Sequence, residues 1–259
     1  MPLNRLLLWM LLIFVGSAAA GEWWDDKPYT EWAAEQTEKI LNSSPWVVLC
    51  PAEPPKQTAG FVRALYVPVY YQVRLLTARP VREGFLRMIS LGLPGAAVDI
   101  ENISGRYAKV EDDRNYMQEF LKSHPNDLRV KADERHIVLC VTLKIAVLEP
   151  SPVIRTASVY PNYQELTNAG QLSNIYPSRI HKDTSLTTGS GERIPLLDYA
   201  MPGADRLGMK FYFPRHSPDG KPLVAAGARE IVFQTRMNDT MIKAKFDLGK
   251  MLYKSKLEF

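Results

Sequence analysis

Apolar and polar residues alternate with a period of two over several stretches of this chain, and that period is typical of half-buried β-strands. The clearest stretch is 61–77, where Val69, Tyr71 and Val73 alternate with polar or aromatic neighbours. The stretch 135–149 is continuously apolar in its middle, which indicates a strand that is buried on both faces. Further strands are predicted over 46–50, 209–213, 229–237, 240–248 and 251–259.

Helical spacing of apolar residues marks shorter segments between these strands. Amphipathic helices are predicted over 31–41, 80–91 and 112–123. Thr30 is expected to cap the first helix, and Pro80 is expected to be the first residue of the second. A short helix is also expected over 160–170. The stretch 183–206 is rich in Gly, Thr, Ser and Pro and is expected to be the longest loop region.

The order of these elements favours one class of fold. Strands gather towards the C-terminus without helices alternating between them, which argues against a parallel βαβ design. We therefore predict an α+β, β-rich fold, in which an antiparallel β-sandwich or bent sheet carries three to four peripheral helices. Residues 21–259 are expected to form a single β-rich globular domain, because the sequence has no internal repeat and no low-complexity tract.

The first residues have a different character. Arg5 supplies a positive charge, 6–15 is an unbroken apolar run, and 16–20 consists of small residues. That order is typical of a cleavable signal peptide. The run is much shorter than the roughly 20 residues that a membrane-spanning helix needs. We predict that 1–20 is a signal peptide and that the mature protein is periplasmic or secreted, with no stable membrane span; the alternative is an N-terminal core helix.

Charge and the two cysteines add little to this picture. The formal net charge is +4 and the charges are dispersed, so no nucleic-acid partner is expected. Cys50 and Cys140 both lie in apolar strand segments. An oxidising compartment would permit a disulfide between them, and the alternative is two free buried thiols that pack as small hydrophobic groups.

The motifs of common enzymes are absent from the sequence. The four histidines do not have zinc spacing, and no H-E-x-x-H, G-x-S-x-G or phosphate-binding loop occurs. His136 and Cys140 would share a strand face but lie too far apart for a direct hydrogen bond. No cofactor and no metal are therefore predicted, and no catalytic residue can be assigned. A pair of carboxylates acting across a cleft could not be recognised from sequence.

Aromatic residues near the predicted mature N-terminus are the strongest candidates for binding. Trp23 and Trp24 could stack on sugars or dock a partner, or they could fix the N-terminal segment to the domain. Trp32 lies on the apolar face of the first predicted helix, and Trp46 begins a strand. Both of these are expected in the core.

Three short landmarks resemble a known group of proteins. They are the stretch 27–32 with the Ser-Pro-Trp that ends at Trp46, the stretch 211–215, and the C-terminal strands from Ile231 to Leu257. Together they resemble a family of uncharacterised secreted proteins from soil bacteria such as the Acidobacteria. The resemblance implies export and a bacterial source, and it implies no activity, ligand or catalytic residue.

The sequence thus leads to a functional expectation of limited detail. We expect an exported non-catalytic protein of the cell envelope with a binding or structural role, whose partner is an envelope protein or a glycan. The alternatives are an exported hydrolase of polysaccharide or peptide, and a carbohydrate-binding module that uses Trp23 and Trp24.

Overall fold

The computed structural model describes most of the chain outside its first 21 residues. The described residues are 22–52, 69–92, 118, 120–146, 163–166, 177–203, 205, 207–237 and 240–259. Several predictions lie outside these ranges, namely the signal peptide over 1–20, the strand residues 61–68, most of the helix over 112–123, and the turn at 238–239.

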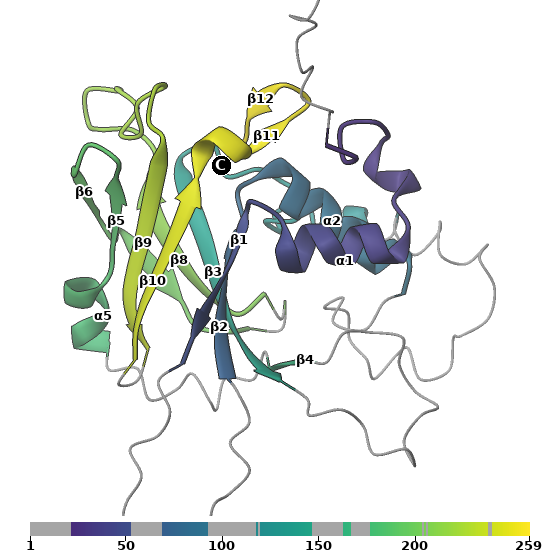
Figure 1. Cartoon of the computed structure of the whole chain (residues 1–259), viewed down its shortest axis with the longest axis horizontal. Coiled ribbons are helices and arrows are strands. Elements are labelled where there is room, and N and C mark those ends of the chain that lie inside the picture. The colour runs from purple at the N-terminus through teal and green to yellow at the C-terminus, as the bar shows by residue number, and fades with distance from the viewer. Residues whose placement is uncertain are drawn as a thin grey trace, which may run out of the picture.

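A six-stranded antiparallel sheet forms the centre of the fold (Figure 1). Its strands are β1 (Val47–Pro51), β2 (Val69–Leu75), β3 (His136–Ala146), β8 (Met209–Pro214) and β7 (Asp198–Ala200), in that order. A further strand, β4 (Tyr163–Leu166), pairs with the end of β3. The long strand β3 is therefore the centre of the sheet, as its apolar middle predicts.

A four-stranded antiparallel sheet packs against the first sheet. Its strands, in spatial order, are β10 (Thr240–Asp247), β9 (Glu230–Met237), β5 (Ser185–Thr188) and β6 (Arg193–Pro195). Side chains alternate strictly between buried and exposed along β10 and between buried and half-buried along β9. One face of this sheet is therefore in the core and the other faces solvent.

Helices cover the side of the six-stranded sheet that faces away from the four-stranded sheet (Figure 1). They are α1 (Ala34–Ser43) and α2 (Arg79–Ser90), which pack on each other. A third helix, α5 (Pro177–Asp183), lies against β9. Two short 3₁₀ turns, η2 (Tyr29–Glu31) and η5 (Leu248–Lys250), and the hairpin of β11 (Leu252–Tyr253) with β12 (Lys256–Leu257) complete the described elements.

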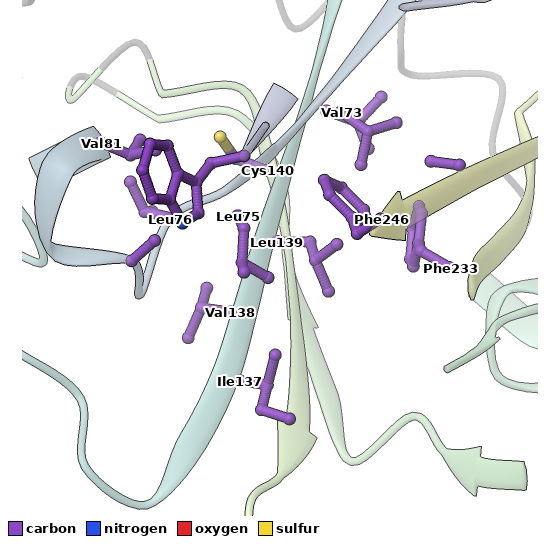
Figure 2. Packing of buried hydrophobic residues seen from close by; sticks show 14 of the residues in the cluster. Val73, Leu75, Leu76, Val81, Ile137, Val138, Leu139, Cys140, Phe233 and Phe246 are labelled. Carbon is purple, nitrogen blue, oxygen red and sulfur yellow. The ribbon is translucent and has the colours of Figure 1, made fainter. Parts of the chain in front are cut away.

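The core has two layers, one on each side of the central sheet. Between the sheets, Leu139 lies near Phe233 and Phe246, whereas Val138 lies with Val81 of α2 on the opposite face (Figure 2). Adjacent residues of β3 point to opposite faces, so both are fully buried because both faces of the sheet are covered. The structure thus confirms the predicted β-rich α+β fold, and its two facing sheets fit the sandwich alternative.

The first helix begins later than its sequence pattern suggests. It starts at Ala34 and not at residue 31, because the fully buried Trp32 has extended backbone dihedrals. Thr30 does not cap the helix. The side chain of Gln36 accepts a hydrogen bond from the amide of Ala33 at 3.0 Å, so the cap comes from within the first turn.

Two segments that were expected to be helix or loop are strands. The prediction of a helix over 160–170 is wrong, because β4 pairs with the part of β3 that extends beyond β8. The prediction of a loop over 183–206 is also wrong, because this stretch contains β5, β6 and β7. Strands of three or four residues are too short to show a period, and pairing with neighbouring strands outweighs local preference.

The last predicted strand, over 251–259, is interrupted by a tight turn. Lys254 and Ser255 have positive φ angles of 50° and 62°, and they reverse the chain between β11 and β12. Two positive φ angles are typical of a type I′ hairpin turn, which usually contains Asn or Gly. Because the turn residues are Lys254 and Ser255, no local signal for this turn is present in the sequence.

The strain in this turn leads to a stability prediction. Replacing Ser255 by glycine is expected to stabilise the protein by about 0.5–1 kcal/mol, because glycine adopts positive φ without steric cost. Equilibrium urea unfolding of the variant and the wild type measures the difference. Glycine at the buried β8 residue Met209, where φ is not positive, is the destabilising control; a destabilised Ser255→Gly variant would refute the turn assignment.

Candidate functional site

The predicted aromatic site is part of the core. Trp24 is 3% exposed, and Trp32 and Trp46 are fully buried. The ring of Trp24 packs edge-to-face against Trp23 and Trp46, with centroid distances of 5.4 and 5.5 Å. Trp23 is half-buried and also packs edge-on against Trp32. Rings in this arrangement fill space and do not present the pair of open faces on which a sugar could stack.

The indole groups also connect distant parts of the chain. The Nε1 of Trp24 donates to the carbonyl of Leu252 at 3.3 Å, and that of Trp46 donates to the carbonyl of Glu258 at 2.7 Å. The carboxylate of Asp25 accepts from the amide of Lys254 at 2.6 Å. The N-terminal segment is thus fixed to the C-terminal hairpin, which is the second of the two roles considered for these tryptophans.

The cysteines lie apart in the central sheet. Cys50 pairs in register with Tyr71, whereas Cys140 pairs with Arg74. Tyr71 and Arg74 are three residues apart on β2, so the two cysteine side chains lie on opposite faces. Two strand spacings also separate them, which exceeds the reach of a disulfide of about 7 Å between Cα atoms. The disulfide alternative is therefore wrong for this fold, and both residues are buried thiols that are not joined to each other.

Burial makes the thiol of Cys50 unreactive. It raises the pKa of Cys50 to about 11, although the hydrogen bond to the carbonyl of Lys243 at 3.5 Å opposes the rise. The thiolate is the nucleophilic form, and it is scarce at neutral pH when the pKa is this high. Cys50 is therefore a packing residue at the place where β1 meets β10.

His136 makes a hydrogen bond to a carboxylate at the start of β3, and none of its described hydrogen bonds involves Cys140. Its Nδ1 lies 2.8 Å from a carboxylate oxygen of Asp133. The other oxygen of Asp133 accepts from the amides of Arg135 and His136 at 3.0 and 3.1 Å. Asp133 thus fixes both the ring and the backbone where the strand begins. Sequence spacing correctly separated His136 from Cys140 but gave no sign of Asp133.

The acid dependence of stability follows from this pair. Burial alone would raise the pKa of Asp133, but hydrogen bonds from His136 and Arg135 outweigh it and lower that pKa. A carboxylate with a lowered folded-state pKa stabilises the protein above its unfolded value of about 3.9, and the contribution disappears as pH falls through the folded value.

Replacing Asp133 by asparagine is therefore expected to cost about 1 kcal/mol at pH 7 and progressively less below pH 4. Urea unfolding of wild type and variant across pH 2 to 7 measures this difference. The control is Asp26→Asn, because Asp26 is exposed. A wild-type advantage over Asp133→Asn that stays constant down to pH 2 would contradict the assignment.

A second buried carboxylate was not found from sequence. Glu83 of α2 is 8% exposed, accepts from Nε of Arg79 at 2.7 Å and accepts from the hydroxyl of Tyr253. Burial and the contact with Glu83 raise the pKa of Tyr253. The contacts among Arg79, Glu83 and Tyr253 join α2 to β11. The spacing of four between Arg79 and Glu83 was the only local signal, since Tyr253 is distant in sequence.

Buried cations join α1 to the sheet. Arg74 is 2% exposed and donates from Nε to the carbonyl of Leu41 at 2.7 Å. The side-chain oxygen of Asn42 accepts from Lys144 at 2.7 Å and from Arg74 at 3.3 Å. These carbonyl groups are at the C-terminal end of α1, where the helix dipole favours positive charge. The cations thus have a structural role in docking the helix.

The outward side of the four-stranded sheet presents a different arrangement. We call it the outer face and define it by Met241, Lys243, Lys245, Val232, Gln234, Arg236, Thr187 and Arg193. Strand register places Lys245, Val232, Thr187 and Arg193 in one row across all four strands. Lys243 and Gln234 are paired in the next row. This face combines cations with neutral hydrogen-bonding groups on a rigid support.

The described ranges contain neither a metal-binding cluster nor a helix that could span a membrane. There, no group of three or more His, Cys, Asp or Glu residues is placed to hold a metal ion. No described helix is both long and apolar enough to cross a membrane.

Comparisons with known proteins gave no relative. No protein-family model matches the chain, and neither a curated protein nor a solved structure matches it. Inferences about function therefore depend on the residues of this chain.

Proposed function

We propose that this protein is an exported, non-catalytic protein of the bacterial cell envelope that acts by binding. The observation that carries the proposal is that the buried or half-buried carboxylate, thiol and imidazole groups have structural contacts, whereas the outer face presents its side chains to solvent. Within the described ranges, Glu83 and Cys50 make contacts that join elements of the fold, and Asp133 fixes the ring and backbone of His136 where β3 begins. The groups that face solvent in an ordered array are those of the outer face.

Export is supported by the N-terminal sequence. A positive charge, a short apolar run and small residues stand in the order that signal peptidase substrates have. The tryptophans that follow then fix the new N-terminal segment to the C-terminal hairpin, so cleavage leaves a tethered end.

The export part is tested by expressing the full chain in a Gram-negative host. We expect a mature protein that begins at Gly21, identified by intact mass, in the periplasmic fraction or the medium. A variant with Leu8→Arg and Leu11→Arg breaks the apolar run and is expected to leave the full-length chain in the cytoplasm. Leu3→Arg adds charge before the run and is the matched control. An unprocessed wild-type chain in the cytoplasm would exclude the proposal.

A further inference from the structure

The outer face carries an excess of positive charge in its central rows. Lys243, Lys245 and Arg193 are exposed, and Arg236 is half-buried. The acidic residues of these strands, Glu230 and Asp247, face each other at one end of β9 and β10. The rows between that end and α5 hold cations and neutral side chains only.

Local ion pairs divide these cations into two groups. Lys245 contacts Glu230, and Arg236 lies 3.3 Å from Asp183 of α5, so part of their charge is neutralised. Among the described contacts Lys243 has no carboxylate partner, and the guanidinium of Arg193 donates to the carbonyl of Lys182 at 3.2 Å. Lys243 and Arg193 are therefore the cations of this face that are best placed to attract an anion from solution.

The spacing of these groups suits an extended ligand. Lys243 and Arg193 lie on the two edge strands, which are three strand spacings or about 14 Å apart, and they are in adjacent rows. Val232 and the hydrogen-bonding side chains of Thr187 and Gln234 lie between them. The sheet fixes the backbone positions from which these side chains extend, so binding of a ligand that bridges both edges requires no rearrangement of the backbone.

We propose that the outer face binds an acidic polysaccharide of the cell envelope. Carboxylates along such a chain complement Lys243 and Arg193 at the two edges, and its hydroxyls complement Thr187 and Gln234 in the middle. The alternation of cations with neutral hydrogen-bonding groups favours a sugar polymer over a polymer that carries charge alone. The inference rests on the proposed binding role, but its test does not depend on export.

The test measures binding of the purified protein to immobilised polygalacturonate at low and high salt. We expect saturable binding that weakens as salt rises, because exposed charges are screened. A double variant with Lys243→Glu and Arg193→Glu is expected to bind at least ten-fold more weakly. The matched control is Lys221→Glu with Lys256→Glu, which changes net charge equally at exposed positions outside the outer face.

Three results would overturn the inference: no binding by the wild type, an equal loss in both double variants, or equally tight binding of polyglutamate. The last result would show that the outer face recognises charge alone and does not select a sugar polymer. Circular dichroism of each variant confirms that a loss of binding is not a loss of fold. Failure of this test leaves the export experiment unaffected, so the two proposals can fail separately.

Discussion

Replacing Gly208 by alanine is expected to destabilise the protein by about 4 kcal/mol. Gly208 has a φ angle of +86°, where an L side chain is strained. A Cβ atom there would lie 2.3 Å from the carbonyl oxygen of Val141 and 2.6 Å from Cγ2 of Thr142. Both neighbours belong to β3, the central strand, so relief of the clash would displace the centre of the sheet.

Gly220 provides the matched control for this prediction. Its φ angle is +81°, and a Cβ atom there would meet nothing within 4 Å. Gly220→Ala therefore introduces the backbone strain without the clash and is expected to cost about 1–2 kcal/mol. Chemical denaturation of the two variants separates these effects. Equal destabilisation by both substitutions would show that β8 does not approach β3 as closely as described.

Replacing Trp46 by alanine is the second change with a large expected effect, a loss of about 4 kcal/mol. Trp46 is fully buried, packs against Trp24 and donates to the carbonyl of Glu258. Its removal leaves a cavity between the N-terminal segment and the C-terminal hairpin. The free energy of unfolding and the rate of proteolysis near both termini measure this loss.

Two variants define the origin of that effect. Trp46→Phe keeps most of the buried ring but removes the indole donor, so a loss of about 1–2 kcal/mol is expected. Trp23 is half-buried, and its replacement by alanine is expected to cost about 1 kcal/mol. If Trp23→Ala and Trp46→Ala were equally destabilising, the tryptophans would not have the order of burial described here.

The sequence predicts best the elements whose apolar positions are clear along their whole length. The strands β3, β9 and β10 and the helix α2 were located within three residues at each end, because β9, β10 and α2 show a clear period and β3 has a continuous apolar run. The short strands β5, β6 and β7 were missed. Their stability comes from strand pairing: β5 pairs with β9, which is distant in sequence, β6 pairs with β5, and β7 pairs with β8. Strands of three or four residues are too short for a local pattern to record these pairings.

The candidate site shows the same limit. The sequence marks Trp23 and Trp24 as candidate binding residues, but only the fold shows that Trp24 is buried. Likewise, the sequence permits a disulfide between Cys50 and Cys140, and only the strand register shows that the two residues lie too far apart for one. The row that joins Lys245 to Arg193 depends on the pairing of four strands. Binding surfaces of sheets are assembled across strands, so sequence order conceals them.

The most direct test of the account measures where the processed protein resides in producing cells and how salt affects it. We expect protein that begins at Gly21 to sediment with isolated cell envelopes at low salt. We also expect its release into the supernatant at high salt, because exposed cations of the outer face make the contact. A full-length chain that stays in the cytoplasm, or a processed chain that never associates with envelopes at low salt, would contradict it.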